Sequence, residues 1–569
     1  MSEYAHGLDE KRIVLRLRAA RGDLERVTLW YGDTACRRTP IDWFPEPMER
    51  ILSDEYHDWW ELTLECPYHR IFYHFELSDG RETCFYYGGV FTDELVDDRS
   101  EYFKLPFNHR ADIARAPDWV HGAVVYNIFP DSFATSRRHI SLEPTEREFG
   151  GLRTRGKLGG TIKGVTENLD YLAELGVNCI YLNPIFAAGE YHKYDLIDYY
   201  HIDPCLGTNE DFRELVDRAH DMDMRVIIDG VFNHCGWRFF AFEDVVQRGE
   251  ASRYKDWFYR LSFPVTRPED PEEIPGYECF GYERLMPKLD TANPEVREYF
   301  CAVGEHWLRE YDIDGWRLDV ADELPDEFLD RFHEAVRKEK KDAFIYGEVW
   351  EDATDKISYG HRRRYLEGGE LDSVMNYPFA NAVIDFVRTA NAEELRECVE
   401  NIVEHYPRAS LDTLMNHIGT HDTVRAITRL GRGDIERPEN GRDRGILTEE
   451  QYQKGVCLLK LASVLQFTLP GVPCVYYGDE AGLAGGEDPF NRACFPWGNE
   501  NAELLDHYRT LGRIRKLCPA FIDGEFNCIS SALGCIAYER NSESCSALII
   551  ANANCHGIEY TVPERWRGA

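Results

Sequence analysis

Apolar and polar positions alternate with a period of two over most of the first hundred residues. In the segment WWELTLEC, the apolar residues Trp60, Leu62 and Leu64 alternate with polar ones, which is typical of a strand with one buried face. Comparable runs are RIVLRLRA, RVTLWYGD, IFYHFEL and RETCFYYGG, and the last two flank Asp79 and Gly80, a dipeptide that favours a hairpin turn. This pattern predicts an N-terminal β-sandwich over residues 1–105.

From about residue 119 the pattern changes to short apolar runs that alternate with amphipathic stretches of helical period. The predicted strands are AVVYNIF, CIYLNPIF, RVIIDGVF, IDGWRLDV, FIYGEVW, SVMNYPF, LMNHIGT and GVPCVYYG. The stretches between them include VTENLDYLAELG, DFRELVDRAHDM, NPEVREYFCAVGEHWLREY and EEQYQKGVCLLKLASVLQF, the third of which begins with a favourable cap, Asn293 followed by Pro294. This order predicts an α/β fold, a (β/α)8 barrel over residues 119–504.

Two further segments do not fit a simple barrel. The connection after the third strand, residues 235–290, is too long for a strand-to-helix loop and predicts a small inserted subdomain. After the helical stretch ELLDHYRTLGRIRKL, the runs GCIAYER, SALIIAN and GIEYTV predict a C-terminal β-domain over residues 519–569.

Composition and charge restrict the possible partners. The chain has 569 residues, which is too long for one core, and a formal net charge of −37, which would repel nucleic acid. We find no apolar run long enough to span a membrane and no secretory signal at the N-terminus. The 17 cysteines are scattered, without a CxxC pair, as expected of a cytoplasmic protein without a disulfide framework.

Polar side chains stand where several predicted strands end. A barrel enzyme carries its catalytic groups at the carboxyl ends of its strands, and a cluster of buried carboxylates is costly unless it has a function. The polar residues at four such ends are Asp229 and His234 (strand three), Arg317 and Asp319 (strand four), Glu348 (strand five), and His421 and Asp422 (strand seven). Any one of them alone could be a structural ion pair, and Asp229 could mainly position Arg317 or a sugar hydroxyl.

These residue types match the needs of a retaining glycosidase. Such an enzyme uses one ionised carboxylate as nucleophile and one protonated carboxyl as acid, about 5–5.5 Å apart. Arg317 lies two residues before Asp319, on the same side of the strand, and should lower the pKa of that carboxyl. Asp422 and the imidazoles of His234 and His421 could bind the hydroxyls around the reacting carbon.

The four segments, in this order and at these spacings, resemble the α-amylase family of glycoside hydrolases. CIYLNPIF, MPKLDTANPEV and GDEAGLAGG…DPFNRACFPW support the resemblance, and MPKL together with YHKYDLIDYYHIDP narrows it. They are similar to the neopullulanase, cyclomaltodextrinase and maltogenic amylase subgroup.

The resemblance implies a role for each of twelve residues. Asp319 would be the nucleophile, Glu348 the acid/base and Asp422 the transition-state stabiliser. The substrate-binding residues would be Tyr194, Asp229, His234, Phe280, Arg317, Trp350, His421, Asp488 and Arg492. Tyr194 and Phe280 have an alternative interpretation as loop packing.

Family members often bind calcium near the start of the barrel, but the expected ligands are missing here. The loop reads FATSRRHISLEPTERE, and the following turn has Thr161 where an aspartate is expected. Calcium requires several carboxylate or carbonyl oxygens, so we predict no metal and no cofactor. The strand-four motif continues VADE where the subgroup more often has VANE, a change expected to matter little.

The resulting hypothesis is a cytoplasmic hydrolase of cyclomaltodextrins, pullulan and malto-oligosaccharides. An α-amylase proper or a 4-α-glucanotransferase would have the same catalytic carboxylates, and a remote alternative is a catalytically inactive subunit of a membrane transport complex. The subgroup resemblance also implies a homodimer, in which the N-terminal domain covers the active site of the second subunit. The loop residues Trp43 and Phe44 are expected to lie outside that domain's own core.

Overall fold

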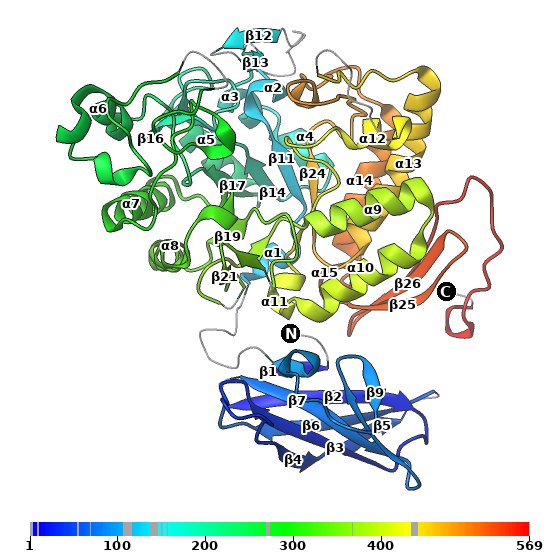
Figure 1. Ribbon diagram of the computed structural model, residues 1–569. Helices are drawn as coiled ribbons and strands as arrows, with labels where there is room; N and C mark the ends of the chain where they lie inside the picture. The colour runs from blue at the N-terminus through cyan, green and yellow to red at the C-terminus, as the bar shows by residue number, and fades with distance from the viewer. Residues whose placement is uncertain are drawn as a thin grey trace. The chain divides into compact units, whose positions relative to one another are not determined.

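The computed structural model describes most of the chain and divides it into two compact units. The described residues are 4–7, 11–53, 56–68, 70–105, 116–136, 146–149, 152–155, 157–268, 273–354, 356–366, 368–433 and 442–567. One unit comprises Met1–Arg115 with Leu366–Gly369 and Glu404–Ala409, and the other comprises the remainder (Figure 1). Most of the predicted linker, residues 106–117, lies outside the described part.

The N-terminal unit consists of two antiparallel sheets. The first has the order β1 (Ala5–Gly7), β2 (Arg12–Ala20), β6 (His57–Glu65) and β5 (Glu49–Ser53). The second has the order β4 (Phe44–Pro47), β3 (Arg26–Asp33), β7 (Ile71–Ser78), β8 (Thr83–Tyr87) and β9 (Val90–Thr92), with β10 (Phe103–Leu105) also paired to β7. One apolar cluster joins Leu15 and Trp60 of the first sheet to Leu29 and Phe75 of the second. The predicted sandwich is therefore confirmed.

The turn and the aromatic residues of this unit can be compared with the prediction. Asp79 accepts hydrogen bonds from the backbone N–H groups of Arg81 and Glu82, which closes the predicted β7–β8 turn. Phe44 is exposed, as expected, but Trp43 packs edge-on against His74, with 4.5 Å between ring centroids. The expectation for Trp43 was wrong because Gly32 has no side chain, which lets residues 41–43 approach β3.

The second unit is built around eight parallel strands. Their order along the chain is β11 (Val125–Ile128), β14 (Cys179–Leu182), β17 (Arg225–Gly230), β18 (Gly315–Leu318), β19 (Phe344–Gly347), β22 (Ser373–Val374), β23 (Met415–Asn416) and β24 (Val472–Tyr476). Neighbouring strands pair in sequence, and a bridge between Met375 and Met415 connects the β22 and β23 ends of the sheet. All eight predicted strands are present, so the predicted barrel is confirmed.

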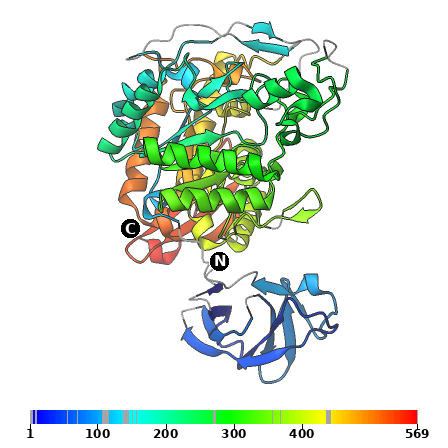
Figure 2. The ribbon, with the colours of Figure 1, turned by 90° about the vertical axis from the view of Figure 1, so that its left-hand side faces the viewer.

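Helices surround this sheet (Figures 1 and 2). They include α3 (Ile162–Thr166), α4 (Leu169–Glu174), α5 (Asn209–Asp221), α7 (Pro294–Tyr311), α8 (Asp326–Glu339), α9 (Tyr377–Thr389), α10 (Ala392–His405), α12 (Ala426–Arg432), α13 (Glu449–Thr468) and α14 (Ala502–Leu517). The Asn293 side chain accepts a hydrogen bond from the Glu295 N–H, 2.9 Å away, and thereby caps α7 as predicted. The predicted helix over residues 165–176 is instead interrupted at Asn168, whose amide bonds to the Gly164 carbonyl.

In its described residues, 231–268 and 273–293, the connection between β17 and α7 contains one helix, α6 (Phe240–Arg248), and three short 3-10 turns. Backbone bridges tie its end to its beginning and to its middle, joining Lys288 to His234 and Leu289 to Phe258. These bridges hold the end of the connection beside the carboxyl end of the third barrel strand.

Three antiparallel strands form the C-terminal sheet, in the order β25 (Glu525–Ala532), β26 (Cys535–Asn541) and β27 (Ser546–Asn552). Two of the three predicted strands are confirmed. The prediction of a strand at residues 557–562 was wrong, and the third strand of the sheet is instead β25, which pairs with β26 opposite β27. Segment 557–562 instead contacts the sheet through side chains, with the Tyr560 hydroxyl 3.2 Å from that of Ser530.

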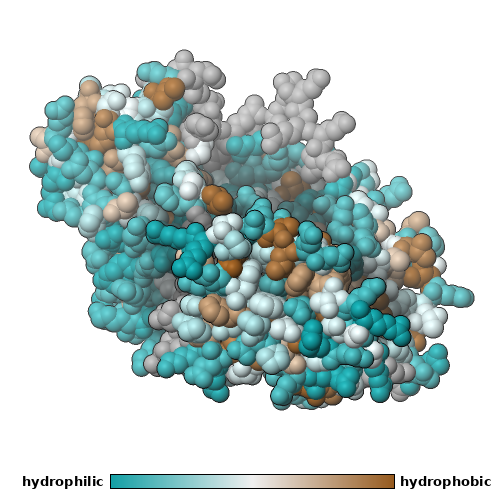
Figure 3. Space-filling model, turned by 60° about the horizontal axis from the view of Figure 1, so that its bottom comes forward, coloured by the Kyte–Doolittle hydropathy of each residue, from teal (hydrophilic) through white to brown (hydrophobic). Residues whose placement is uncertain are grey.

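Three features bear on the predictions from composition: the cysteines, the surface and the apolar character of the helices. None of the 17 cysteines, all of which are described, forms a disulfide. The face shown in Figure 3 is mostly hydrophilic, with apolar residues in small separate spots. Within the described ranges, we find no helix whose length and apolar character would suit a membrane crossing.

Candidate active site

Three adjacent barrel strands place acidic groups at their carboxyl ends. Asp229 in β17 is the register partner of Arg317 in β18. The pairing continues just past the strands, because the Asp319 N–H donates to the Gly230 carbonyl and the Glu348 N–H donates to that of Leu318, each at 3.0 Å. The strand register thus brings three carboxylates to one rim of the barrel.

Arg317 joins these three carboxylates. Its Nη1 lies 2.9 Å from Asp229 Oδ1 and 2.8 Å from Asp319 Oδ1, and its Nη2 lies 2.9 Å from Glu348 Oε2. The guanidinium is fully buried, and its Nε donates to the sulfur of Met375. One positive charge therefore faces three acidic groups, and all four side chains are buried.

The electrostatics of Asp319 differ from the expectation. Burial raises the pKa of the Asp319 carboxyl well above its usual range, and the Arg317 guanidinium opposes this shift without cancelling it. Burial likewise raises the pKa of Asp229. The prediction considered only the charge of Arg317, whereas desolvation and the neighbouring carboxylates act in the opposite direction. Burial and the neighbouring carboxylates therefore both favour the protonated form of Asp319.

Glu348 is fixed by groups on both of its oxygens. Its Oε2 accepts a hydrogen bond from the Val320 N–H at 2.9 Å, and its Oε1 accepts one from Trp350 Nε1 at 3.1 Å. Val320 has φ of 46°, a left-handed conformation that is rare for a β-branched residue. Such strain costs about 1–3 kcal/mol and is typical of functional sites. Trp350, 48% exposed, stacks on Tyr377 with centroids 4.2 Å apart.

A second group of predicted residues surrounds Asp422. His421 Nε2 lies 3.0 Å from Asp422 Oδ2, and Arg492 Nη2 lies 3.4 Å from Asp422 Oδ1. Arg492 also donates to the His421 carbonyl at 2.9 Å and pairs with Asp488 at 3.3 Å. Burial, followed by the charge of Arg492, lowers the pKa of His421 well below its usual range, so this imidazole is neutral at neutral pH.

Aromatic contacts connect the remaining predicted residues. Tyr194 stacks on His421 at 5.3 Å and donates its hydroxyl proton to Asp229 Oδ2 at 3.1 Å. His234 stacks on Phe280 at 4.6 Å, and its Nδ1 lies 3.4 Å from the Asn233 amide nitrogen. Burial lowers the pKa of His234 to about 3, which keeps it neutral as well. Ten of the twelve predicted site residues therefore belong to one network of direct contacts, and the other two, His234 and Phe280, contact each other.

Several residues of this network were missed by the sequence analysis. The Asn183 amide lies 3.0 Å from His421 Nδ1 and 3.3 Å from the Tyr194 hydroxyl. Asn183 directly follows β14, so the strand-end rule that found the other residues could have found it. Tyr181, inside the same strand, donates to Asp229 at 2.9 Å. Asn491 donates to the carbonyls of His421 and Thr423.

The region where calcium was considered is only partly described. Thr161 caps α3 through its hydroxyl, and the Asp131 carboxylate accepts the N–H groups of Leu158 and Gly159 at 3.1 Å. Most of the loop FATSRRHISLEPTERE lies outside the described residues. In the described ranges, no group of three or more His, Cys, Asp or Glu side chains is arranged to hold a metal ion.

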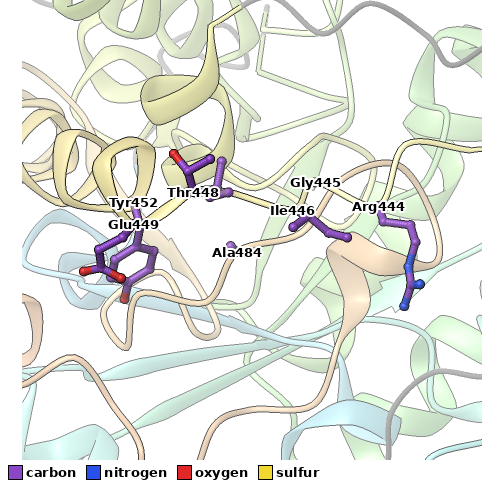
Figure 4. A pocket seen from close by; sticks show the side chains of 8 residues that line it. Arg444, Gly445, Ile446, Thr448, Glu449, Tyr452 and Ala484 are labelled. Carbon is purple, nitrogen blue, oxygen red and sulfur yellow. The ribbon is translucent and has the colours of Figure 1, made fainter.

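A separate pocket of about 470 Å³ lies at the start of α13 (Figure 4). It is lined by Arg444, Gly445, Ile446, Leu447, Thr448, Glu449, Tyr452 and Ala484. None of these is a predicted site residue, and the lining contains a single carboxylate, which does not provide the pair that the expected chemistry requires. The carboxylate cluster around Arg317 is therefore the stronger candidate for catalysis.

Comparison with known proteins agrees with this geometry. The chain matches the family described as "Alpha amylase, catalytic domain" over residues 127–503. The chain belongs to the α-amylase family. Residues 1–109 match "Alpha amylase, N-terminal ig-like domain". As a family member, the protein is a glycoside hydrolase.

Its relatives are similar over nearly the whole chain. A cyclomaltodextrinase of Geobacillus thermopakistaniensis is 37% identical over 99% of this chain and 92% of its own length. Neopullulanase 2 of Thermoactinomyces vulgaris is 37% identical over 90% of this chain and 82% of its own, and an intracellular maltogenic amylase of Bacillus subtilis is 36% identical over 90% and 83%. A solved cyclomaltodextrinase structure covers 96% of this chain and 89% of its own, with a TM-score of 0.75 at 35% identity.

Proposed function

We propose that this protein hydrolyses α-1,4 glucosidic bonds, and also α-1,6 bonds, of cyclomaltodextrins, pullulan and malto-oligosaccharides with retention of configuration. The observation that carries the proposal is the buried guanidinium of Arg317, which contacts Asp319 and Glu348 through its two Nη atoms. This arrangement brings two carboxyl groups close together, as the retaining mechanism requires. The names of the relatives support the substrate class.

In the first step, Asp319 acts as nucleophile. One of its carboxylate oxygens forms a bond to the anomeric carbon while the bond to the leaving oxygen breaks, and Glu348 gives its proton to that oxygen. In the second step, Glu348 removes a proton from water. The water oxygen then bonds to the same carbon, and the ester to Asp319 breaks. Two inversions at one carbon give net retention.

The other residues have supporting roles in this proposal. Asp422 binds hydroxyls of the reacting sugar as positive charge develops, and Arg492 holds that carboxylate in place. The neutral imidazoles of His234 and His421 donate hydrogen bonds to hydroxyls, and Tyr194 offers a ring face to the sugar. Asp229 and Asp488 anchor Arg317 and Arg492, while Trp350 and Phe280 line the leaving-group side.

The division of roles is tested with two variants and two substrates. Asp319→Asn and Glu348→Gln should each lower kcat on maltotriose by several orders of magnitude, because no neighbour can replace either step. On α-glucosyl fluoride, whose leaving group needs little protonation, Glu348→Gln should recover noticeably and Asp319→Asn should not. The exposed carboxylate Glu298, in α7, provides a matched control, since Glu298→Gln should retain full activity. Equal recovery of both variants would refute the assignment.

Substrate preference is tested by product analysis on γ-cyclodextrin, pullulan and soluble starch side by side. The proposal expects faster cleavage of γ-cyclodextrin than of starch. The reverse order would favour an α-amylase proper, and products longer than the substrate would favour a 4-α-glucanotransferase. A catalytically inactive subunit is disfavoured because all the required carboxylates are present and in contact.

We further propose that the protein acts as a cytoplasmic homodimer without a cofactor. The relative named as intracellular supports the location. Exposed apolar side chains of the N-terminal unit, Phe44, Ile51, Leu52, Tyr56 and Phe91, support an interface there. Contact of this unit with a second subunit would narrow the cleft and favour small substrates.

A further inference from the structure

A short hairpin follows the fifth barrel strand and carries an exposed aromatic residue at its tip. Its strands are β20 (Ile357–Ser358) and β21 (His361–Arg362), joined by Tyr359 and Gly360. Both tip residues have positive φ, 53° and 81°, as a two-residue hairpin turn requires. This conformation is unfavourable for a tyrosine, yet it leaves Tyr359 72% exposed.

The tip lies against the rim of the active site. The ammonium of Lys288 is 5.7 Å from the centroid of the Tyr359 ring and also forms an ion pair with Glu323. Glu323 is one of the neighbouring groups that, after burial, raise the pKa of the Tyr359 hydroxyl. Glu323 follows Asp319 by four residues, and the backbone of Lys288 is bridged to His234. Tyr359 is therefore in direct contact with the residues that border the site.

This position is on the leaving-group side of the proposed reaction. His234, the bridge partner of Lys288, stacks on Phe280, and the hairpin continues the loop that begins with Glu348 and Trp350. Glu348 protonates the leaving oxygen in the proposed mechanism, so sugars beyond that oxygen extend toward this rim. The rim offers an exposed ring face and two charged groups that can bind hydroxyls.

Asp322 connects the hairpin to the loop that carries the nucleophile. Its carboxylate forms an ion pair with Lys356 and accepts the Tyr365 hydroxyl at 2.7 Å. Its carbonyl accepts the Ser358 hydroxyl and Arg363 Nη1, each at 3.2 Å. Four groups from residues 356–365 thus converge on one residue, three positions after Asp319. An asparagine there could not form the ion pair, which bears on the expectation that VADE in place of VANE matters little.

We propose that Tyr359 is a specificity-determining residue that stacks on a glucosyl unit on the leaving-group side, and that Asp322 positions it there. This inference rests on the proposed function. Aromatic faces pack against the C–H faces of pyranose rings, and the adjacent Lys288 and Glu323 select hydroxyls. The same surface would hold either the departing part of a substrate or an incoming acceptor sugar.

The test compares substrates that do and do not reach this rim, in the full-length protein. α-Glucosyl fluoride fills only the position at the nucleophile, so Tyr359→Ala should leave its hydrolysis unchanged. On maltotriose, KM should rise about tenfold with kcat less affected, as expected for loss of one stacking contact. The yield of products formed by transfer of a glucosyl unit to added maltose should fall by a similar factor if acceptor sugars bind here too. Loss of transfer without a change in KM would assign the surface to acceptors alone.

Three further variants separate recognition from structure. Tyr359→Phe keeps the aromatic ring, so its KM should stay close to that of the wild type. Ile357→Ala, on the same hairpin and about equally exposed, should also behave as wild type. Asp322→Asn should reproduce the KM change of Tyr359→Ala, and the double variant should be no worse than either single one. If Tyr359 had a purely structural role, its replacement would lower the melting temperature and would change KM and kcat together.

Binding provides a measure that does not depend on turnover. Calorimetric titration of maltotriose into Glu348→Gln, with and without Tyr359→Ala, should show about tenfold weaker binding in the double variant. Unchanged KM, transfer and binding in Tyr359→Ala would overturn the inference, and so would a Phe variant as impaired as the Ala variant. If the proposed roles fail instead, the Asp319 and Glu348 variants respond alike to the fluoride, while the binding measurement still decides the role of Tyr359.

Discussion

Replacing His74 with phenylalanine should remove an acid-sensitive element from the N-terminal unit. The imidazole is fully buried, and neither ring nitrogen has a hydrogen-bond partner among the described residues. Trp43, Trp30, Phe85 and Tyr102 surround it, with ring centroids 4.5–6.2 Å away. A phenyl ring has a similar size and needs no partner, so it should fit this cage.

The magnitude follows from the pKa of the buried imidazole. Burial lowers the pKa of His74 from 6.5 to about 4. The unfolded chain therefore takes up a proton as the pH falls below 6.5, while the folded unit resists protonation. Stability is fully present above pH 6.5 and is lost progressively down to about pH 4. At about 1.4 kcal/mol per pH unit, the loss amounts to about 3 kcal/mol.

Hydrogen exchange of the β7 amides between pH 8 and pH 4.5 measures this loss locally, which a global melting curve of a multi-domain chain does not. After correction for intrinsic exchange rates, the protection of the wild type should fall with pH by more than that of His74→Phe. His556→Phe, at an exposed position, is the matched control and should follow the wild type. Parallel pH profiles for the wild type and His74→Phe would refute the reasoning.

Three other predictions concern the metal, the assembly and a helix cap. Dialysis against EDTA should leave activity and melting temperature unchanged, and a loss that calcium restores would reveal a site that we did not identify. Deleting residues 1–105 should convert dimers to monomers in light scattering and reduce the preference for cyclodextrin; a monomeric full-length protein with that preference would contradict the dimer mechanism. Asn293→Ala should lower the hydrogen-exchange protection of the α7 amides by about 1 kcal/mol, whereas Asn293→Asp should be nearly neutral, because only the aspartate keeps a capping oxygen.

The sequence predicted the strands and the catalytic candidates because both produce local signals. A polar residue directly after a buried strand, such as Glu348, stands out wherever it occurs. The contacts of Arg317 with three carboxylates could not be predicted, because they depend on the register of β17, β18 and β19. For the same reason the direction of the pKa shift of Asp319 was missed, since burial is a property of the packed barrel.

The hairpin around Tyr359 gave no signal that could be recognised. Its strands contain two residues each, too few for a period to appear. The motif VADE differs from the VANE that the resemblance leads one to expect, but the contacts of its aspartate include Lys356, 34 residues away in the chain. Single residues whose partners are distant in sequence are the part of the site that requires a structure.

The hydrogen bonds from Asn491 and Arg492 to the backbone around His421 have a consequence for protein engineering. They join the loop after β23 to the segment after β24, so these two connections cannot be exchanged as independent modules. A chimera that takes only one of them from a relative would lose the contacts that hold Asp422, even if every catalytic residue were retained. Grafts that alter substrate choice in this barrel should transfer both connections as a single piece.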